Sequence, residues 1–93
     1  MSVKQYASVW DAVEGSPAQA ENMKLRSTLM RAIIAWIEDE DLTQAEAARL
    51  MAVTQPRISD LVRGKIDLFS IDMLVNMLSA AGLHVEVHIA QAD

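Results

Sequence analysis

The spacing of hydrophobic and polar positions in the middle of the chain predicts two short helices joined by a tight turn. The first spans residues 44–51 and turns a narrow apolar face inward, made of Ala47, Ala48 and Met51. Thr43 and Glu46 form the T-x-x-E pattern of a capping box, in which hydroxyl and carboxylate satisfy free amides at the helix start. The turn is expected at Ala52 and Val53.

The second helix is expected to begin after Thr54 and to end at Gly64. Thr54 is a favourable N-cap, and Pro56 costs no hydrogen bond in a first turn, whose amides have no partner within the helix. At about 100 degrees per residue, one side is apolar: Ile58, Leu61 and Val62. The opposite side and its flanks are polar except for the proline: Gln55, Pro56, Arg57, Ser59, Asp60 and Arg63. A supported helix with a polar N-terminal half suits the DNA major groove, although an ordinary helical hairpin would also fit.

Longer elements are expected on both sides of this pair. Ser16 and Pro17 start a helix that runs to about Glu38, with an apolar stripe of Met23, Met30, Ile33, Ile34 and Ile37 widened by Leu25, Leu29 and Trp36. Residues 8–14 could add one short turn that docks through Trp10 and Val13. Residues 65–69 form a loop, after which Ser70 caps a last helix over residues 71–81, stopped by Gly82.

The end of the chain changes from helical to alternating spacing. Residues 83–89 alternate strictly, and the apolar positions are Leu83, Val85, Val87 and Ile89. This pattern predicts a half-buried strand, and no convincing second strand exists in the sequence. We therefore expect the strand to pair with its copy in a two-fold dimer; pairing with a strand of another protein is the alternative.

The central residues resemble a known family. The stretches L-T-Q-A-E-A-A from Leu42 and V-T-Q-P-R-I-S-D-L-V-R-G-K from Val53 are similar to the lambda-repressor-like (XRE) helix-turn-helix domain. The following D-L-F-S-I-D-M-L-V-N-M-L-S-A-A-G resembles the HigA-like antitoxin branch, in which a G-K-x-x-x-F-S stretch precedes the last helix. The resemblance covers about residues 17–89.

The resemblance implies a set of DNA contacts. Gln44 and Thr54 would touch phosphates. The residues implied to face bases are Gln55, Pro56, Ser59 and Asp60, and those implied to hold the backbone or a neighbouring base are Arg57, Arg63 and Lys65. Asp60 could instead pair with Arg57 or Arg63. The family usually has glycine where this chain has Ala52, which would cost about 1 kcal/mol if that position is left-handed.

Composition limits the function. The 93 residues form a single domain with 52% hydrophobic content, arranged as an N-terminal segment, 1–16, and the helix-turn-helix domain, 17–93. The net charge of minus 5 divides into minus 3 for residues 1–42, plus 2 for 43–66 and minus 4 for 67–93. A local positive face predicts modest monomer affinity for DNA and favours two copies on one site. The acidic remainder could meet a basic partner or simply keep the protein soluble.

The sequence offers little support for a metal site or for catalysis. Cysteine is absent, and neither a secretory leader nor an apolar membrane span is present, so a cytoplasmic protein is expected. His84, Glu86 and His88 form H-x-E-x-H on one strand face, but residues two apart on a strand lie about 7 Å apart, too far for three to close on one zinc. We expect no metal, no cofactor and no enzyme activity.

These patterns predict a mainly α, lambda-repressor-like domain of about five helices with a C-terminal strand paired across a homodimer. The expected function is sequence-specific repression at a palindromic operator. The resemblance further implies the antitoxin of a toxin–antitoxin pair, which controls its own operon and neutralises a basic ribonuclease toxin. A plain prophage-type or metabolic repressor, or a protein-interaction module without DNA affinity, remains the alternative.

Overall fold

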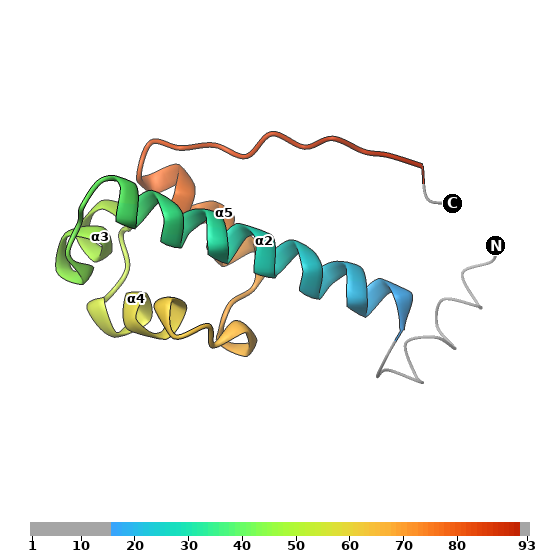
Figure 1. Ribbon diagram of the computed structural model, residues 1–93, viewed down its shortest axis with the longest axis horizontal. Helices are drawn as coiled ribbons and strands as arrows, with labels where there is room; N and C mark the ends of the chain where they lie inside the picture. The colour runs from blue at the N-terminus through green and yellow to red at the C-terminus, as the bar shows by residue number, and fades with distance from the viewer. Residues whose placement is uncertain (1–15, 92–93) are drawn as a thin grey trace.

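A computed structural model describes residues 16–91 (Figure 1). This part of the chain contains four α-helices and one short 3-10 helix: α2 (Pro17–Asp39), α3 (Gln44–Met51), α4 (Gln55–Val62), η1 (Ile66–Leu68) and α5 (Ile71–Ala80). The four predicted α-helices of this range are confirmed, and η1 lies in the predicted loop. The short turn expected at residues 8–14, with Trp10 and Val13, lies outside the described residues. No helix within residues 16–91 is long and apolar enough to cross a membrane.

Each α-helix begins where a hydroxyl side chain caps it. Oγ atoms of the four capping residues accept from backbone amides three residues later, at 3.0 Å for Ser16, 3.1 Å for Thr43, 3.3 Å for Thr54 and 3.1 Å for Ser70. At Thr43 the capping box is complete, because its amide donates to Glu46 Oε1 at 2.8 Å. These bonds satisfy amides that lack a partner inside the helix, so the sequence fixes the helix starts locally.

The core lies between the long α2 and the three shorter α-helices. α2 packs against α5, η1 and α4, while α3 packs against α4 and α5 (Figure 1). The largest side chains at its centre are almost fully enclosed: Phe69, Ile33, Met51, Ile58, Leu61, Leu74 and Met77. Every α-helix contributes at least one of them. The contribution of α4 is Ile58 and Leu61, so apolar contacts hold this helix along its inner side.

Three residues expected on apolar faces are exposed instead. Val62 is 43% exposed, although the helical spacing placed it beside Ile58 and Leu61. It is the last residue of α4, whose inner side is narrow because a short helix at the surface buries only one face. Met23 and Leu25 are 36% and 46% exposed, since the described helices pack against the part of α2 that follows them.

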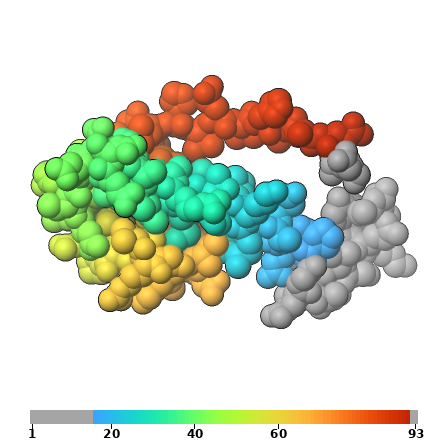
Figure 2. Space-filling view, viewed as in Figure 1, coloured from blue at the N-terminus to red at the C-terminus, as the bar shows by residue number. Residues whose placement is uncertain are grey.

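The C-terminal segment, residues 83–91, contains no strand in the described structure. It is drawn as an extended arm beyond α5, and Figure 2 shows an open space between its outer part and α2. Leu83 and Val85 pack against the core, whereas Val87 and Ile89 are 75% and 84% exposed. A strand requires a hydrogen-bonded neighbour, and residues 16–91 offer none, so the expected strand is not formed by this chain alone. Pairing between two copies stays a prediction.

Candidate nucleic-acid interface

The turn between α3 and α4 is built on a left-handed residue. Ala52 has φ 59° and ψ 40°, the conformation that favours glycine. The amides of Ala52 and Val53 donate back to the carbonyls of Arg49 at 3.3 Å and Ala48 at 3.0 Å. The chain can therefore reverse within the turn and reach the Thr54 cap at once. The position at which the resembled family usually has glycine is left-handed in this chain, and alanine adopts it with strain of about 1 kcal/mol.

Small and enclosed side chains bring the two helices together. Ala47 of α3 is fully buried and Ala48 is nearly so, and methyl side chains leave room for α4 to cross closely. On the α4 side, Ile58 and Leu61 have no exposed surface. This packing fixes the inner face of α4, so its opposite face must project from the body.

The projecting face carries an open hollow of about 390 Å³ at the start of α4. It is lined by Gln44 from α3 and by Gln55, Pro56 and Ser59 from α4. Gln55 and Pro56 are exposed, and Gln44 and Ser59 are half-buried. Four of the predicted contact residues, separated by up to 15 positions in sequence, therefore share one concave surface.

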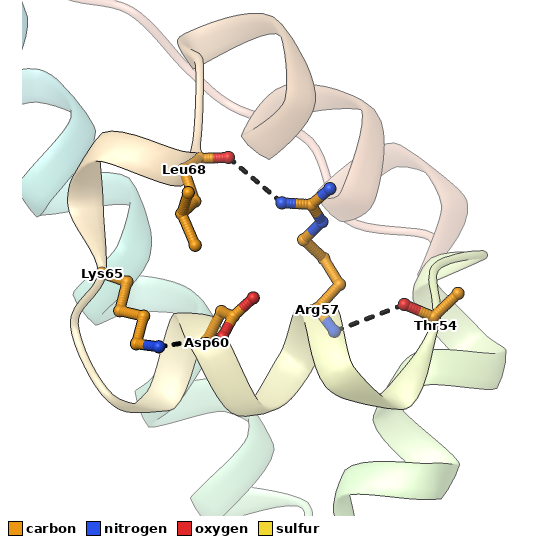
Figure 3. A network of polar contacts seen from close by, with 5 residues as sticks. All are labelled: Thr54, Arg57, Asp60, Lys65 and Leu68. Carbon is orange, nitrogen blue, oxygen red and sulfur yellow. Dashed lines mark hydrogen bonds and ion pairs between the residues drawn. The ribbon is translucent and has the colours of Figure 1, made fainter.

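Asp60 pairs with a cation other than the two expected. Its carboxylate lies 3.6 Å from Lys65 Nζ, in a partly exposed ion pair (Figure 3). Gly64, with φ 77°, turns the chain back so that the Lys65 amide donates to the Asp60 carbonyl at 3.1 Å. The alternative pairing with Arg57 or Arg63 is not seen. The pair neutralises one cation and one anion of the predicted surface.

Arg57 is directed away from the hollow. One of its guanidinium nitrogens donates to the Leu68 carbonyl at 3.2 Å (Figure 3). Its central carbon lies 5.6 Å from the centre of the Phe69 ring. The second distance is within the range of a cation–π contact. Arg63, the other arginine of this region, is exposed, and no ion pair or side-chain hydrogen bond links it to residues 16–91. The two arginines therefore stand in different environments.

Arg26 also contacts this region, and the sequence pattern did not predict it. From the middle of α2 it donates through one nitrogen to the carbonyls of Ile66 and Phe69, at 3.4 and 3.3 Å. Its Nε donates to Asn22 Oδ1 at 2.9 Å. The i,i+4 spacing of Asn22 and Arg26 weakly indicates that these two side chains meet on the helix. The contacts with residues 40 and 43 positions away cannot be predicted from the spacing of residues within one helix.

The fold and this surface define a helix-turn-helix protein, and comparisons agree. A helix-turn-helix domain family matches residues 12–90, and the chain belongs to it. A solved structure described as an XRE family transcriptional regulator superposes with a TM-score of 0.72 and 32% identity, over 80% of this chain and 83% of that one. No curated protein matches the chain. The expected XRE-type helix-turn-helix is thus confirmed, and with it membership of a class of DNA-binding transcriptional regulators.

Proposed function

We propose that this protein is a repressor that reads a palindromic DNA site with the N-terminal half of α4. The observation that carries the proposal is the shared hollow of Gln44, Gln55, Pro56 and Ser59, which faces outward while Ile58 and Leu61 anchor the helix from behind. A helix presented in this way can enter a major groove, where polar side chains meet base edges.

Roles within the surface follow from side-chain chemistry. Gln55 is exposed at the first position of α4 and can pair bidentately with adenine. Ser59 can bond either kind of base edge, while Pro56 offers apolar contact. Gln44 and Thr54, at the starts of the two helices, are suited to phosphate oxygens. Asp60 follows Ser59 in α4 and is joined to Lys65 of the loop after the helix, so this pair would meet the edge of the site.

Cations are few for a DNA-binding surface, which supports the use of two copies. Lys65 is paired with Asp60, and Arg57 is held by the Leu68 carbonyl, so Arg63 is the arginine of α4's end that remains available to a phosphate. Because each neutralised phosphate adds to affinity, a single chain should bind modestly. We propose a homodimer joined through the C-terminal arm, whose apolar positions are Leu83, Val85, Val87 and Ile89.

We further propose that the protein is the antitoxin of a toxin–antitoxin pair. The support is the resemblance of the stretch from Gly64 to Ser70 to HigA-like antitoxins, and a surplus of acidic residues outside the DNA-reading region. Such a surplus suits a basic ribonuclease. Co-expression of the product of the adjacent gene tests this: growth arrest relieved by this chain, with a complex that purifies intact, supports it. An adjacent gene whose product is harmless points to a plain repressor instead.

Selection of duplexes from a random pool tests the DNA proposal. The unaltered protein should enrich one palindromic motif, and Gln55→Ala should change the preferred bases more than the total affinity. Asn76→Ala is the matched control, because it removes an exposed amide from α5, far in sequence from the hollow. Enrichment of no motif would reject sequence-specific binding, and an unchanged motif for Gln55→Ala would remove that residue from base reading.

A further inference from the structure

The loop that follows the reading helix is held from two sides by arginines. Arg57 of α4 donates to the Leu68 carbonyl at 3.2 Å, and Arg26 of α2 donates to the carbonyls of Ile66 and Phe69 at 3.4 and 3.3 Å. Three carbonyl oxygens within four consecutive residues thus accept from two cations. Hydrogen bonds to a charged donor are stronger than neutral ones, and these three connect the loop to both helices.

Phe69 ties the same loop to the core. Its side chain is 2% exposed, and the Arg57 guanidinium lies over its ring at 5.6 Å. Arg57 thus holds both the loop backbone and the aromatic anchor, and Arg26 joins that backbone to α2. Together the contacts connect the first turn of α4 with η1 and with α2.

We propose that Arg26 and Arg57 are positioning residues that set the orientation of α4 for DNA, and that Arg57 does not itself neutralise a phosphate. The inference rests on the proposed function, and it changes the role that the family resemblance implies for Arg57. Turning the guanidinium toward DNA would break both the bond to Leu68 and the contact with Phe69.

The place of Arg57 in α4 connects its loop contacts to the recognition of DNA bases. Arg57 is the third residue of the helix, between Gln55 and Ser59, so its side chain is attached at the level of the hollow. Its hydrogen bond to Leu68 therefore connects the first turn of α4 to the loop, and the bond from Arg26 connects the loop to α2. Loss of either arginine would let the N-terminal half of α4 rotate and misalign its polar side chains.

The salt dependence of binding separates positioning from phosphate contact. Affinity for the duplex selected by the unaltered protein is measured across salt concentrations for Arg57→Ala, Arg26→Lys, Arg63→Ala and Lys24→Ala. Arg57→Ala and Arg26→Lys should bind roughly 2- to 30-fold more weakly, with an unchanged slope of log affinity against log salt. Arg63→Ala should lower the slope by about 0.9, as expected for one lost phosphate contact. Lys24→Ala, which removes an exposed charge from α2, should match the unaltered protein.

Lysine carries the same charge as arginine, but its single nitrogen cannot contact the loop carbonyls and Asn22 from separate donors as the guanidinium does, so Arg26→Lys tests geometry rather than charge. The double variant Arg26→Lys/Arg57→Ala should lose less affinity than the product of the single losses, because both residues hold one loop. A slope for Arg57→Ala that falls with that of Arg63→Ala would overturn the proposal, as would full affinity of Arg57→Ala.

A measurement without DNA keeps the two proposals distinct. The amides of Leu68 and Phe69 donate within the loop at 3.0 and 3.2 Å, and their hydrogen exchange should be faster in Arg57→Ala and Arg26→Lys than in Lys24→Ala. Unchanged exchange would reject the holding role even if DNA binding falls. If the unaltered protein selects no duplex, the DNA function fails, while the exchange result still decides whether the arginines hold the loop. Arg57→Lys replaces Arg57→Ala if circular dichroism shows that the alanine variant does not fold.

Discussion

The helix-turn-helix unit and the C-terminal arm differ in what surrounds their apolar side chains. In α3 and α4, Ala47, Ile58 and Leu61 are completely enclosed by this chain. In the arm, Val87 and Ile89 are 75% and 84% exposed, although their spacing is as regular as that of the helices. A single copy of the protein encloses the apolar side chains of the two helices, but leaves those at the end of the arm exposed.

An apolar pattern therefore predicts which face of a segment is buried, but not what covers that face. The backbone hydrogen bonds of a helix are made within the helix and its caps, so α4 needs only an apolar neighbour, which α3 and α2 provide. A strand needs both a neighbour for its face and a ladder for its backbone. Leu83 and Val85 of the arm pack against the core, whereas the backbone of residues 83–91 forms no ladder within the described part of the chain.

The strongest test of this comparison removes apolar volume from each region. Ile58→Ala should lower the free energy of unfolding by about 2–5 kcal/mol, because it leaves a cavity where the side chain is fully enclosed. Val87→Ala should change it by less than about 0.5 kcal/mol in dilute protein, since most of that side chain is exposed. Thermal melts followed by circular dichroism give both values. Equal losses would show that the arm is already packed within one copy.

Deleting residues 83–93 tests whether a second copy completes the arm. The helices should persist, while sedimentation should show a monomer and operator affinity should fall on the order of a hundredfold, because the second half-site contact is lost. Val87→Asp/Ile89→Asp is the milder companion variant, because it leaves Leu83 and Val85 on the core. Val85→Pro removes one ladder donor and should act in the same direction. A dimer of undiminished affinity would move the interface to the helices.

A smaller effect is expected at the turn of the helix-turn-helix unit. Ala52→Gly should raise the free energy of unfolding by up to about 1 kcal/mol, because glycine adopts the left-handed conformation without strain. DNA affinity should not change, since the backbone path is the same. Urea unfolding measures the difference, and Ala45→Gly, within α3, is the control that should destabilise instead. A destabilised Ala52→Gly protein would show that the turn is unstrained.

The smallest effect concerns the charge of the capping box. A hydrogen bond from the Thr43 amide, with lesser help from the Thr43 hydroxyl and Arg49, lowers the pKa of Glu46 below its ordinary value. Because the folded-state pKa is depressed, the stabilisation is present above the ordinary pKa and is lost as pH falls through the lowered one. Glu46→Gln keeps the cap geometry without the charge. Melting temperatures of the two proteins should differ slightly at neutral pH and converge in acid; a gap that widens in acid would contradict this.

The amino-acid sequence alone was enough to predict where the helices begin and which side of α4 is apolar. The caps at Ser16, Thr43, Thr54 and Ser70 act over three residues, so they could be recognised from spacing alone. The outward face of α4 followed from its apolar face, because packing Ile58 inward leaves Pro56, Ser59 and Arg63 on the other side. Its DNA contacts and the partner of the arm remain predictions.

Tertiary structure alone decided where the long charged side chains go. Arg57 reaches Leu68, 11 residues away, and Arg26 reaches Phe69, 43 residues away. Both contacts exist because burial of Phe69 brings the loop carbonyls beside two helices that approach from different parts of the chain. The exposure of Val62 was decided in the same way, by how little of α4 the neighbouring helices cover. Periodicity describes one helix at a time, whereas these outcomes depend on the relative placement of three.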